Sequence, residues 1–230
     1  METVLPDLIR IDLGYVNAFL WTGPAGPTLI DTGFPWTFNR LLDALNAAAV
    51  KPADLQRIII THADLDHIGG LRKLRSLTSA PIACHTAEAA FITGKAPLPV
   101  RRTLPGWVVG MGSRLLSGLT RPTVPEVQEY LLDKDTTPEG FKVVYLPGHS
   151  PGHIALYHKK REALIAGDAI INRYNHLSLP PLLFTPDEKQ AVESLSKLKP
   201  LHFETACFGH GPCITEGADK KIRSFVEHLS

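Results

Sequence analysis

The segment THADLDHIGG, residues 61–70, decides how the rest of this sequence is interpreted. Within six residues it contains four side chains that can bind a metal ion: His62, Asp64, Asp66 and His67. At the histidine and aspartate content of this chain, the pattern H-x-D-x-D-H arises by chance in roughly one such chain per thousand. A segment that follows a buried strand can aim alternate side chains at one point while the strand holds them still. The segment therefore predicts a metal site.

The residues just before this segment predict the strand that holds it. The run 57–61 contains three consecutive isoleucines, and a continuous β-branched run is typical of a strand that is buried on both faces. Three more candidate ligands follow predicted strands, each in a turn that contains glycine: His149 (PGHSPGH, 147–153), Asp168 (AGDA, 166–169) and His210 (FGHGP, 208–212). Glycine lets the backbone turn sharply and approach a ligand closely. These ligands are expected to meet at one rim of the sheets.

The rest of the chain alternates between short β-rich runs and segments with helical periodicity. Strands are predicted at 8–13, 16–22, 27–31, 57–61, 81–84, 127–133, 141–146, 154–158, 163–166 and 203–208. Helices are predicted at 36–50, 69–77, 86–92, 186–198 and 216–229, with Thr86 as the N-cap of the third. Because strands precede helices in each half of the chain, we expect two related halves of a layered α/β sandwich.

The composition excludes several classes of protein. With 24 Lys and Arg against 23 Asp and Glu, the net charge is +1, which provides no basic surface for a nucleic-acid partner. At 44% hydrophobic and 20% charged residues, the 230 residues are predicted to form a single globular domain. No window approaches the ~20 apolar residues of a membrane span, and the first residues lack the pattern of a signal peptide. We therefore expect a cytoplasmic protein that contacts no membrane.

Other polar and thiol side chains receive structural interpretations. The three cysteines, Cys84, Cys207 and Cys213, lack the spacing of a CxxC metal or redox motif and are predicted to be buried free thiols. Four histidines carry no spacing signal and are predicted to lie on the surface: His158, His176, His202 and His228. His85 follows a predicted buried strand. Two interpretations of it remain open: it supports the metal site through a contact, or it lies at the edge of the core.

The order of the motifs H-x-D-x-D-H, P-G-H-S-P-G-H, G-D and G-H-G, across residues 62–210, resembles the metallo-β-lactamase superfamily. The resemblance implies a four-layer αββα sandwich. It implies two metal ions, with these ligands: His62, Asp64 and His149 for the first ion, Asp66, His67 and His210 for the second, and Asp168 as a bridge. It further implies that Asp31 supports the ligand loop from outside the coordination shell and that His153 is a non-ligating histidine.

Asp64 departs from the family pattern, which most often has histidine at this position. A carboxylate in place of an imidazole lowers the formal charge of the inner shell by one unit, so the centre becomes a weaker Lewis acid. A hard oxygen ligand also shifts the preference of the first site from zinc, the expected metal, toward Mn²⁺ or Fe²⁺. Two arrangements remain open: Asp64 binds and the centre holds two divalent ions, or Asp64 turns away and one ion is held well.

The resemblance implies a metallo-hydrolase in which a hydroxide held by the metal ions attacks a carbonyl or phosphoryl centre. Asp66 is then both a ligand and the catalytic residue that accepts or shuttles the proton. The expected partner is a small-molecule substrate, a hydrophobic ester, lactone or thioester. Against a lactonase, Ile171 stands where that branch of the family has tyrosine, and Tyr174 is the nearest phenol. A phosphodiesterase or nuclease, a di-iron redox protein and an inactive metal-binding module remain alternatives.

Residues 94–125 interrupt the pattern of strands and helices. Prolines at 97, 99, 105, 122 and 125 flank an apolar stretch, which predicts an insertion with one short helix. In the resembling family such segments cover the mouth of the active site, and Trp107 and Met111 would then suit a hydrophobic substrate. The alternative is a packing surface, or a contact between two copies in a homodimer.

Overall fold

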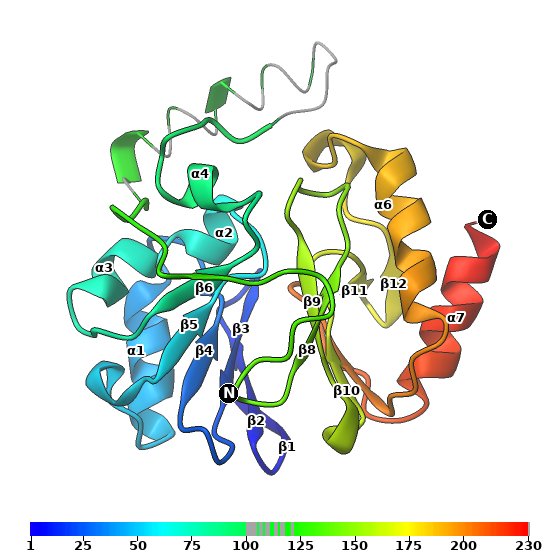
Figure 1. Ribbon diagram of the computed structural model, residues 1–230, viewed down its shortest axis with the longest axis horizontal. Coiled ribbons are helices and arrows are strands. Elements are labelled where there is room, and N and C mark those ends of the chain that lie inside the picture. Colours follow the sequence, from blue (N-terminus) through cyan, green and yellow to red (C-terminus); the bar gives the residue numbers. More distant parts are fainter. Residues whose placement is uncertain are drawn as a thin grey trace.

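Two β-sheets pack against each other in the middle of the molecule, and helices cover the outer face of each sheet (Figure 1). The computed structural model describes residues 1–99, 105, 108, 111–112, 115, 118–120 and 122–229. The predicted four-layer αββα sandwich is confirmed.

The first sheet comes from the N-terminal half of the chain. Its strands, in spatial order, are β1 (Glu2–Leu5), β2 (Leu8–Asp12), β3 (Asn17–Trp21), β4 (Thr28–Ile30), β5 (Arg57–Ile59), β6 (Ile82–Cys84) and β7 (Glu129–Tyr130). Strands β1 to β4 are antiparallel neighbours, as the predicted meander requires, whereas β4 to β7 are parallel. The helices over its outer face are α1 (Phe38–Ala47), α2 (Leu65–Ile68), α3 (Leu71–Arg75) and α4 (Ala89–Ile92).

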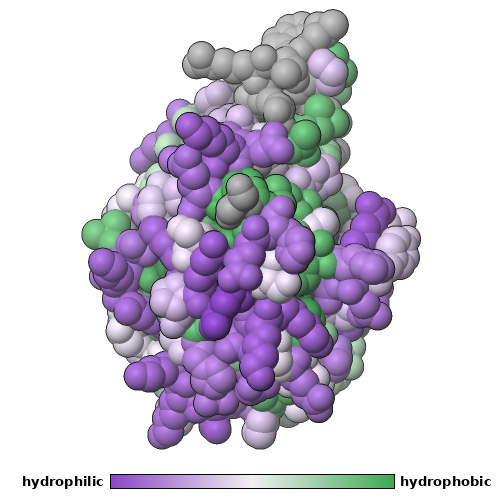
Figure 2. Space-filling model, turned by 90° about the vertical axis from the view of Figure 1, so that its right-hand side faces the viewer, coloured by the Kyte–Doolittle hydropathy of each residue, from purple (hydrophilic) through white to green (hydrophobic). Residues whose placement is uncertain are grey.

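The second sheet comes from the C-terminal half. Its order is β13 (Thr205–Cys207), β10 (Ala163–Ile165), β9 (Ile154–His158) and β8 (Lys142–Tyr145), and β11 (Ile171–Arg173) pairs with β12 (His176–Ser178) beside it. Helices α6 (Glu188–Leu195) and α7 (Ala218–His228) cover its outer face. The surface over these two helices is mostly hydrophilic, with smaller hydrophobic areas between the polar side chains (Figure 2).

The three consecutive isoleucines of the β5 region show how the layers are held together. Ile58 and Ile60 belong to the apolar cluster under α1 and α3, whereas Ile59 belongs to the cluster between the two sheets. Successive side chains of a strand point to opposite faces, so a strand with both faces covered needs an uninterrupted apolar run. In the cluster between the sheets, the rings of Trp21 and Phe141 meet edge to face with centroids 4.8 Å apart. This cluster joins the two halves of the molecule.

The structure also corrects several sequence predictions. Helix α4 begins at Ala89 with Glu88 as the N-cap, because residues 85–88 form a turn in which the backbone N–H of Glu88 donates to the carbonyl of His85; Thr86 is not the cap. Strand β7 is shorter than the predicted 127–133, and β1, β11, β12 and α2 were not predicted. His158 is buried rather than on the surface, since it lies at the end of β9 against the ring of Trp21.

The cysteine prediction is correct for two of the three thiols. Cys84 and Cys207 are buried, but Cys213 is half-buried. Its sulfur lies 2.9 Å from the sulfur of Cys207, because residues 206 and 214 form an antiparallel bridge on either side of the intervening loop.

The predicted insertion is described only in part. Its described residues between 105 and 120 are helical, and four of their apolar side chains are exposed: Val108, Met111, Leu115 and Leu119. Trp107 lies outside the described residues, so its role as a lid over the site stays a prediction, as does the homodimer. Among the described residues no helix combines the length and the apolar character needed to cross a bilayer.

Replacing Phe141 with alanine should destabilise the protein by about 3–5 kcal/mol, because Phe141 is fully buried between the sheets and its loss leaves a cavity. Urea denaturation of the metal-loaded protein measures the free energy of unfolding. Leu132→Ala, at a side chain that is 49% exposed, is the matched control and should change stability by about 0.5 kcal/mol or less. Equal effects of the two variants would contradict the central position of Phe141.

Candidate metal centre

All seven predicted ligands converge at one edge of the two sheets. His62 follows β5, Asp64 to His67 surround the start of α2, and the other three follow β8, β10 and β13. Among these seven residues, three sets have ligand atoms within 4.8 Å of one another: His62, Asp64 and His149; His62, His67 and Asp168; and Asp66, His67 and His210. Two of these sets are the ones that the family resemblance implies for the first and second metal ions. The structure therefore brings together residues that are 148 positions apart in the chain, from His62 to His210.

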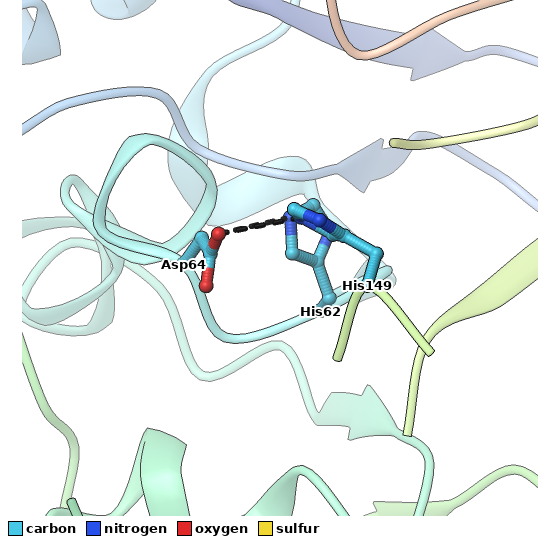
Figure 3. A group of neighbouring side chains, drawn as sticks. All are labelled: His62, Asp64 and His149. Atoms are coloured by element: carbon cyan, nitrogen blue, oxygen red, sulfur yellow. Dashed lines mark ion pairs between the residues drawn. The ribbon is translucent and has the colours of Figure 1, made fainter. Parts of the chain in front are cut away.

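The first set has Asp64 turned toward the two histidines (Figure 3). Its Oδ2 lies 3.3 Å from Nε2 of His149 and 3.9 Å from Nε2 of His62. Asp64 is the N-cap residue of α2 with an extended backbone, and its side chain forms no capping hydrogen bond with the helix. Of the two arrangements that the sequence left open, this geometry favours the one in which Asp64 is available as a ligand.

The second set is joined to the first by Asp168. Nε2 of His210 lies 3.3 Å from Oδ2 of Asp66 and 3.0 Å from Oδ2 of Asp168. The other carboxylate oxygen of Asp168 lies 3.5 Å from Nε2 of His67, and Oδ2 also lies 3.9 Å from Nε2 of His149. Asp168 therefore faces histidines of both sets, which is the position that a bridging ligand requires.

Several buried polar atoms of these side chains fit a bound cation. Among the described residues, these atoms have no hydrogen-bond partner: Nε2 of His62, Nε2 of His67, both ring nitrogens of His149, and Oδ1 of Asp168. Buried polar atoms almost always have partners, because an unsatisfied one costs about 1–3 kcal/mol. Imidazole nitrogens and carboxylate oxygens are ligands of zinc, iron and manganese. The residues present therefore fit a divalent metal centre.

The electrostatics of the cluster lead to the same conclusion. Burial lowers the pKa of His62 well below its ordinary value, and the neighbouring His67 and His149 lower it further. Burial alone would also lower the pKa of His210, but Asp168 and Asp66 outweigh it and raise the pKa to about 10. The carboxylates therefore favour the protonated form of His210, whereas burial favours the neutral form of His62. A metal ion would displace the proton of His210, so its binding is coupled to pH.

Asp31 holds the ligand loop from the adjacent strand end, as predicted. Its Oδ2 lies 2.9 Å from Nδ1 of His67 and accepts a hydrogen bond of 2.7 Å from the hydroxyl of Thr61, while Oδ1 accepts from the backbone N–H of Thr61. Asp31 adopts φ = 60°, a left-handed conformation that is uncommon outside glycine. This conformation turns the carboxylate back onto the loop and leaves Nε2 of His67 facing the centre.

Glu88 is a supporting residue that the sequence analysis missed. The side chain is fully buried, and Oε2 accepts a hydrogen bond of 2.8 Å from the backbone N–H of Ala63. Oε1 accepts from the hydroxyl of Ser150 at 2.8 Å and from the backbone N–H of Gly152 at 2.6 Å. Burial raises the pKa of Glu88, although these hydrogen bonds oppose it. One carboxylate thus joins the loop that carries His62 to the loop that carries His149.

His153 supports Asp168 rather than lying among the ligand sets. Its Nε2 accepts a hydrogen bond of 2.9 Å from the backbone N–H of Asp168. Burial lowers the pKa of His153 to about 3, and His149 contributes to the shift, so the ring is neutral near pH 7 and can accept this bond. His85 is buried at the edge of the core, where it stacks on Tyr145 with ring centroids 4.3 Å apart.

Gly209 provides space for the centre. A Cβ at this position would overlap Oδ1 of Asp168 and would lie 2.9 Å from Cε1 of His67. Any side chain here would push two ligands apart. The glycine beside His210 is therefore required by the packing of the ligands and not only by the turn.

Comparison with known proteins identifies the family. Residues 11–210 match the family model of the metallo-beta-lactamase superfamily, and the chain belongs to this superfamily of metallo-hydrolases. The probable metallo-hydrolase YflN of Bacillus subtilis (strain 168) is 30% identical over 236 residues, which cover 93% of this chain and 86% of YflN. Hydroxyacylglutathione hydrolase GloC of Haemophilus influenzae is 23% identical over 96% of this chain and all of that protein.

Solved structures show the same fold. The metallo-beta-lactamase family protein TTHA1429 from Thermus thermophilus superimposes with a TM-score of 0.72 at 24% identity, over 99% of this chain and 79% of that one. TTHA1623, whose structure is of a di-iron-bound form, superimposes with a TM-score of 0.64 at 25% identity, over 98% and 99% of the two chains.

Gly209→Ala should reduce the metal content of the purified protein, because the added methyl group displaces Asp168 and His67. Elemental analysis by mass spectrometry, after loading with zinc, manganese or iron, measures the ratio of metal to protein. Gly112→Ala is the control, since a Cβ there meets no described atom within 4 Å. Full metal occupancy of Gly209→Ala would show that these two side chains are not ligands.

Glu88→Gln should weaken metal binding by about 10–100-fold, the usual effect of removing a contact that orients a ligand. The amide has one acceptor oxygen where the carboxylate has two, so the N–H of Ala63 or the donors of Ser150 and Gly152 lose their partner. Competition with a chelator measures the affinity. The exposed Glu216→Gln is the control. Wild-type affinity in Glu88→Gln would contradict its supporting role.

Proposed function

We propose that this chain hydrolyses an ester, lactone or thioester bond of a small, apolar substrate with the help of two divalent metal ions. The observation that carries the proposal is the pair of ligand sets joined by Asp168. The residues that would hold the ions are His62, Asp64 and His149 for one, Asp66, His67 and His210 for the other, and Asp168 for both. Bound ions would supply Lewis acidity that polarises the carbonyl and lowers the pKa of a water molecule.

Exposure indicates the side from which a substrate approaches. The side chains of His62 and His67 are fully buried, whereas those of Asp64, Asp66 and His210 are 27%, 19% and 29% exposed. The open side of the centre is therefore lined by two carboxylates and one imidazole. A substrate carbonyl that enters there meets Asp66 before it meets the buried histidines.

Asp66 is suited to move the proton in this reaction. Burial alone would raise its pKa, but His67 and His210 outweigh that effect and lower the pKa. The carboxylate is therefore ionised near pH 7 and can accept a proton. Its Oδ2 lies at the open side beside Nε2 of His210, where it can pass the proton to a departing alkoxide or thiolate.

Aromatic and apolar side chains beside the centre support an apolar substrate. Trp36 is 61% exposed and stacks on Phe34 with ring centroids 4.4 Å apart. Pro35, between them, packs against Gly69 at the end of the ligand segment. On the other side, the backbone N–H of Asp187 donates to the carbonyl of Gly148, so the chain just after the exposed Phe184 lies against the loop of His149. Exposed apolar groups beside a site commonly contact ligands.

The comparisons favour a thioester among the three bonds. GloC, which matches 96% of this chain, is named a hydroxyacylglutathione hydrolase. A lactonase is less supported, because Ile171 is buried in β11 where a phenol is expected, and Tyr174 lies 83% exposed at the β11–β12 turn. We therefore rank thioesters and esters before lactones.

A substrate panel tests the proposal. The protein loaded with zinc, manganese or iron is assayed on acyl thioesters, aryl esters, lactones and a bis-aryl phosphodiester, with short and long apolar acyl chains. We expect turnover of a carbonyl substrate, with kcat/KM rising as the acyl chain lengthens. Turnover of the phosphodiester alone would replace the proposal with a phosphodiesterase or nuclease, and oxidation of a reduced flavin donor by an iron-loaded but non-hydrolytic protein would indicate the redox alternative.

Asp66→Asn should lower kcat by about 10²–10⁴-fold, the usual contribution of a proton-transferring side chain, and the fold should be retained. Steady-state kinetics measure the loss, and circular dichroism checks the fold. The control is Asp43→Asn on the exposed face of α1, which should keep wild-type activity. Activity of Asp66→Asn within a factor of a few of wild type would remove Asp66 from the mechanism.

A further inference from the structure

Two cysteines face each other at the base of the loop that carries His210. The sequence there is CFGHGPC, from Cys207 to Cys213. The thiol of Cys213 lies 2.9 Å from the sulfur of Cys207. Among the described residues, neither cysteine forms a disulfide. Neither sulfur belongs to the three sets of metal-ligating side chains around His62, His67 and Asp66.

The backbone register is the one that accepts a disulfide between strands. Ala206 and Ile214 exchange two backbone hydrogen bonds of 2.8 Å, so they are a hydrogen-bonded antiparallel pair. Cys207 and Cys213 are the next residues inward from this isolated bridge, at the positions of a non-hydrogen-bonded pair, in which Cα atoms are about 4.5 Å apart. That distance lies within the range of about 4.4–6.8 Å found for disulfides. The bond can form with a sulfur movement of roughly an ångström and no rearrangement of the strands.

The loop between the two cysteines is already fixed at several points. The side-chain amide of Asn17 donates to the carbonyls of Phe208 and Gly211, and the backbone N–H of Asn172 donates to the carbonyl of His210. These contacts hold the loop in one conformation, so the two sulfurs stay close. The thiols differ in access, because Cys207 is buried and Cys213 is half-buried. Cys213 is therefore the thiol that an oxidant from solution meets first.

We propose that Cys207 and Cys213 form a redox modification site, which hydrogen peroxide oxidises to a reversible disulfide that closes the His210 loop. The sulfur of Cys213 attacks the peroxide, so an S–O bond forms, the O–O bond breaks and one water leaves after protonation. The sulfur of Cys207 then attacks the sulfenic sulfur of Cys213, so the S–S bond forms and the S–O bond breaks. The proton of Cys207 leaves with the hydroxide as a second water. Two thiols are oxidised by two electrons and one peroxide is reduced to two waters.

The disulfide has a consequence for the metal centre. His210 lies at the middle of the closed segment, three residues from each cysteine. Local opening of the loop carries His210 away from Asp66 and Asp168, and a covalent bond at the base of the loop opposes that opening. The oxidised protein therefore releases metal more slowly than the reduced protein.

Peptide mapping of the metal-loaded protein tests the site. The protein is treated with hydrogen peroxide, unfolded, alkylated with iodoacetamide and digested with trypsin. Both cysteines fall in one tryptic peptide, residues 198–220, because the bond after Lys199 precedes proline. We expect this peptide to lose two hydrogen atoms and both alkyl groups after peroxide, and to regain both thiols with dithiothreitol. Cys84, in another peptide, stays alkylated in both samples.

Cys213→Ser is the matched variant, because it keeps the size of a half-buried side chain and removes one sulfur. In this variant Cys207 should remain alkylated after the same treatment. Sulfinic acid at Cys213, disulfide-linked dimers or two unchanged thiols in wild type would each overturn the proposed site. For the metal centre, oxidation should slow release to a chelator by at least about twofold in wild type and not in Cys213→Ser, since loop opening precedes release. Equal release rates would overturn the stated effect on the His210 loop.

Discussion

Four imidazoles and one carboxylate are buried side by side where the two sheets meet. His62, His67, His149, His153 and Asp168 are each at most 4% exposed. Burying polar and charged groups is unfavourable unless each finds a partner, and the penalty is several kcal/mol for an isolated ion. The neighbouring side chains and loops provide hydrogen-bond partners for several of these buried groups. Divalent cations would meet the remaining requirement, since the unpartnered nitrogens and oxygens face one another.

Three side chains outside the ligand sets hold the ligands in place from different directions. Asp31 contacts Nδ1 of His67. Glu88 joins the loops of His62 and His149 through hydrogen bonds to their backbone. His153 accepts a hydrogen bond from the backbone N–H of Asp168. Each of the three accepts a hydrogen bond from a backbone N–H group, and Asp31 also contacts the side chain of the ligand His67. The positions of the ligands therefore depend on hydrogen bonds to main-chain atoms of neighbouring loops, which fix geometry more firmly than contacts between mobile side chains.

The sequence was sufficient to predict the cluster of candidate ligands because they stand in four short motifs, each of which follows a strand and has a spacing that is visible along the chain. The same reasoning could not find Glu88, because two of its three partners are the backbone N–H groups at positions 63 and 152 and the third is the hydroxyl of Ser150. Every residue except proline has a backbone N–H group, so no sequence pattern marks these contacts. Strands β11 and β12 were missed because Asn172, Arg173 and His176 interrupt the apolar pattern by which the other three-residue strands were predicted. Helix α4 begins three residues later than predicted, since a local turn competes with the helical cap at Thr86.

The division of the ligands between the two halves of the chain has a mechanical meaning. Residues 62–67 belong to the half that forms the first sheet, whereas His149, Asp168 and His210 belong to the half that forms the second. A cation between the two sets of ligands would join the two halves, because separating the sheets would remove the ligands that one half contributes. The free energy of unfolding would then depend on whether the centre holds an ion. Tight binding of the ion would add directly to the stability of the contact between the two halves.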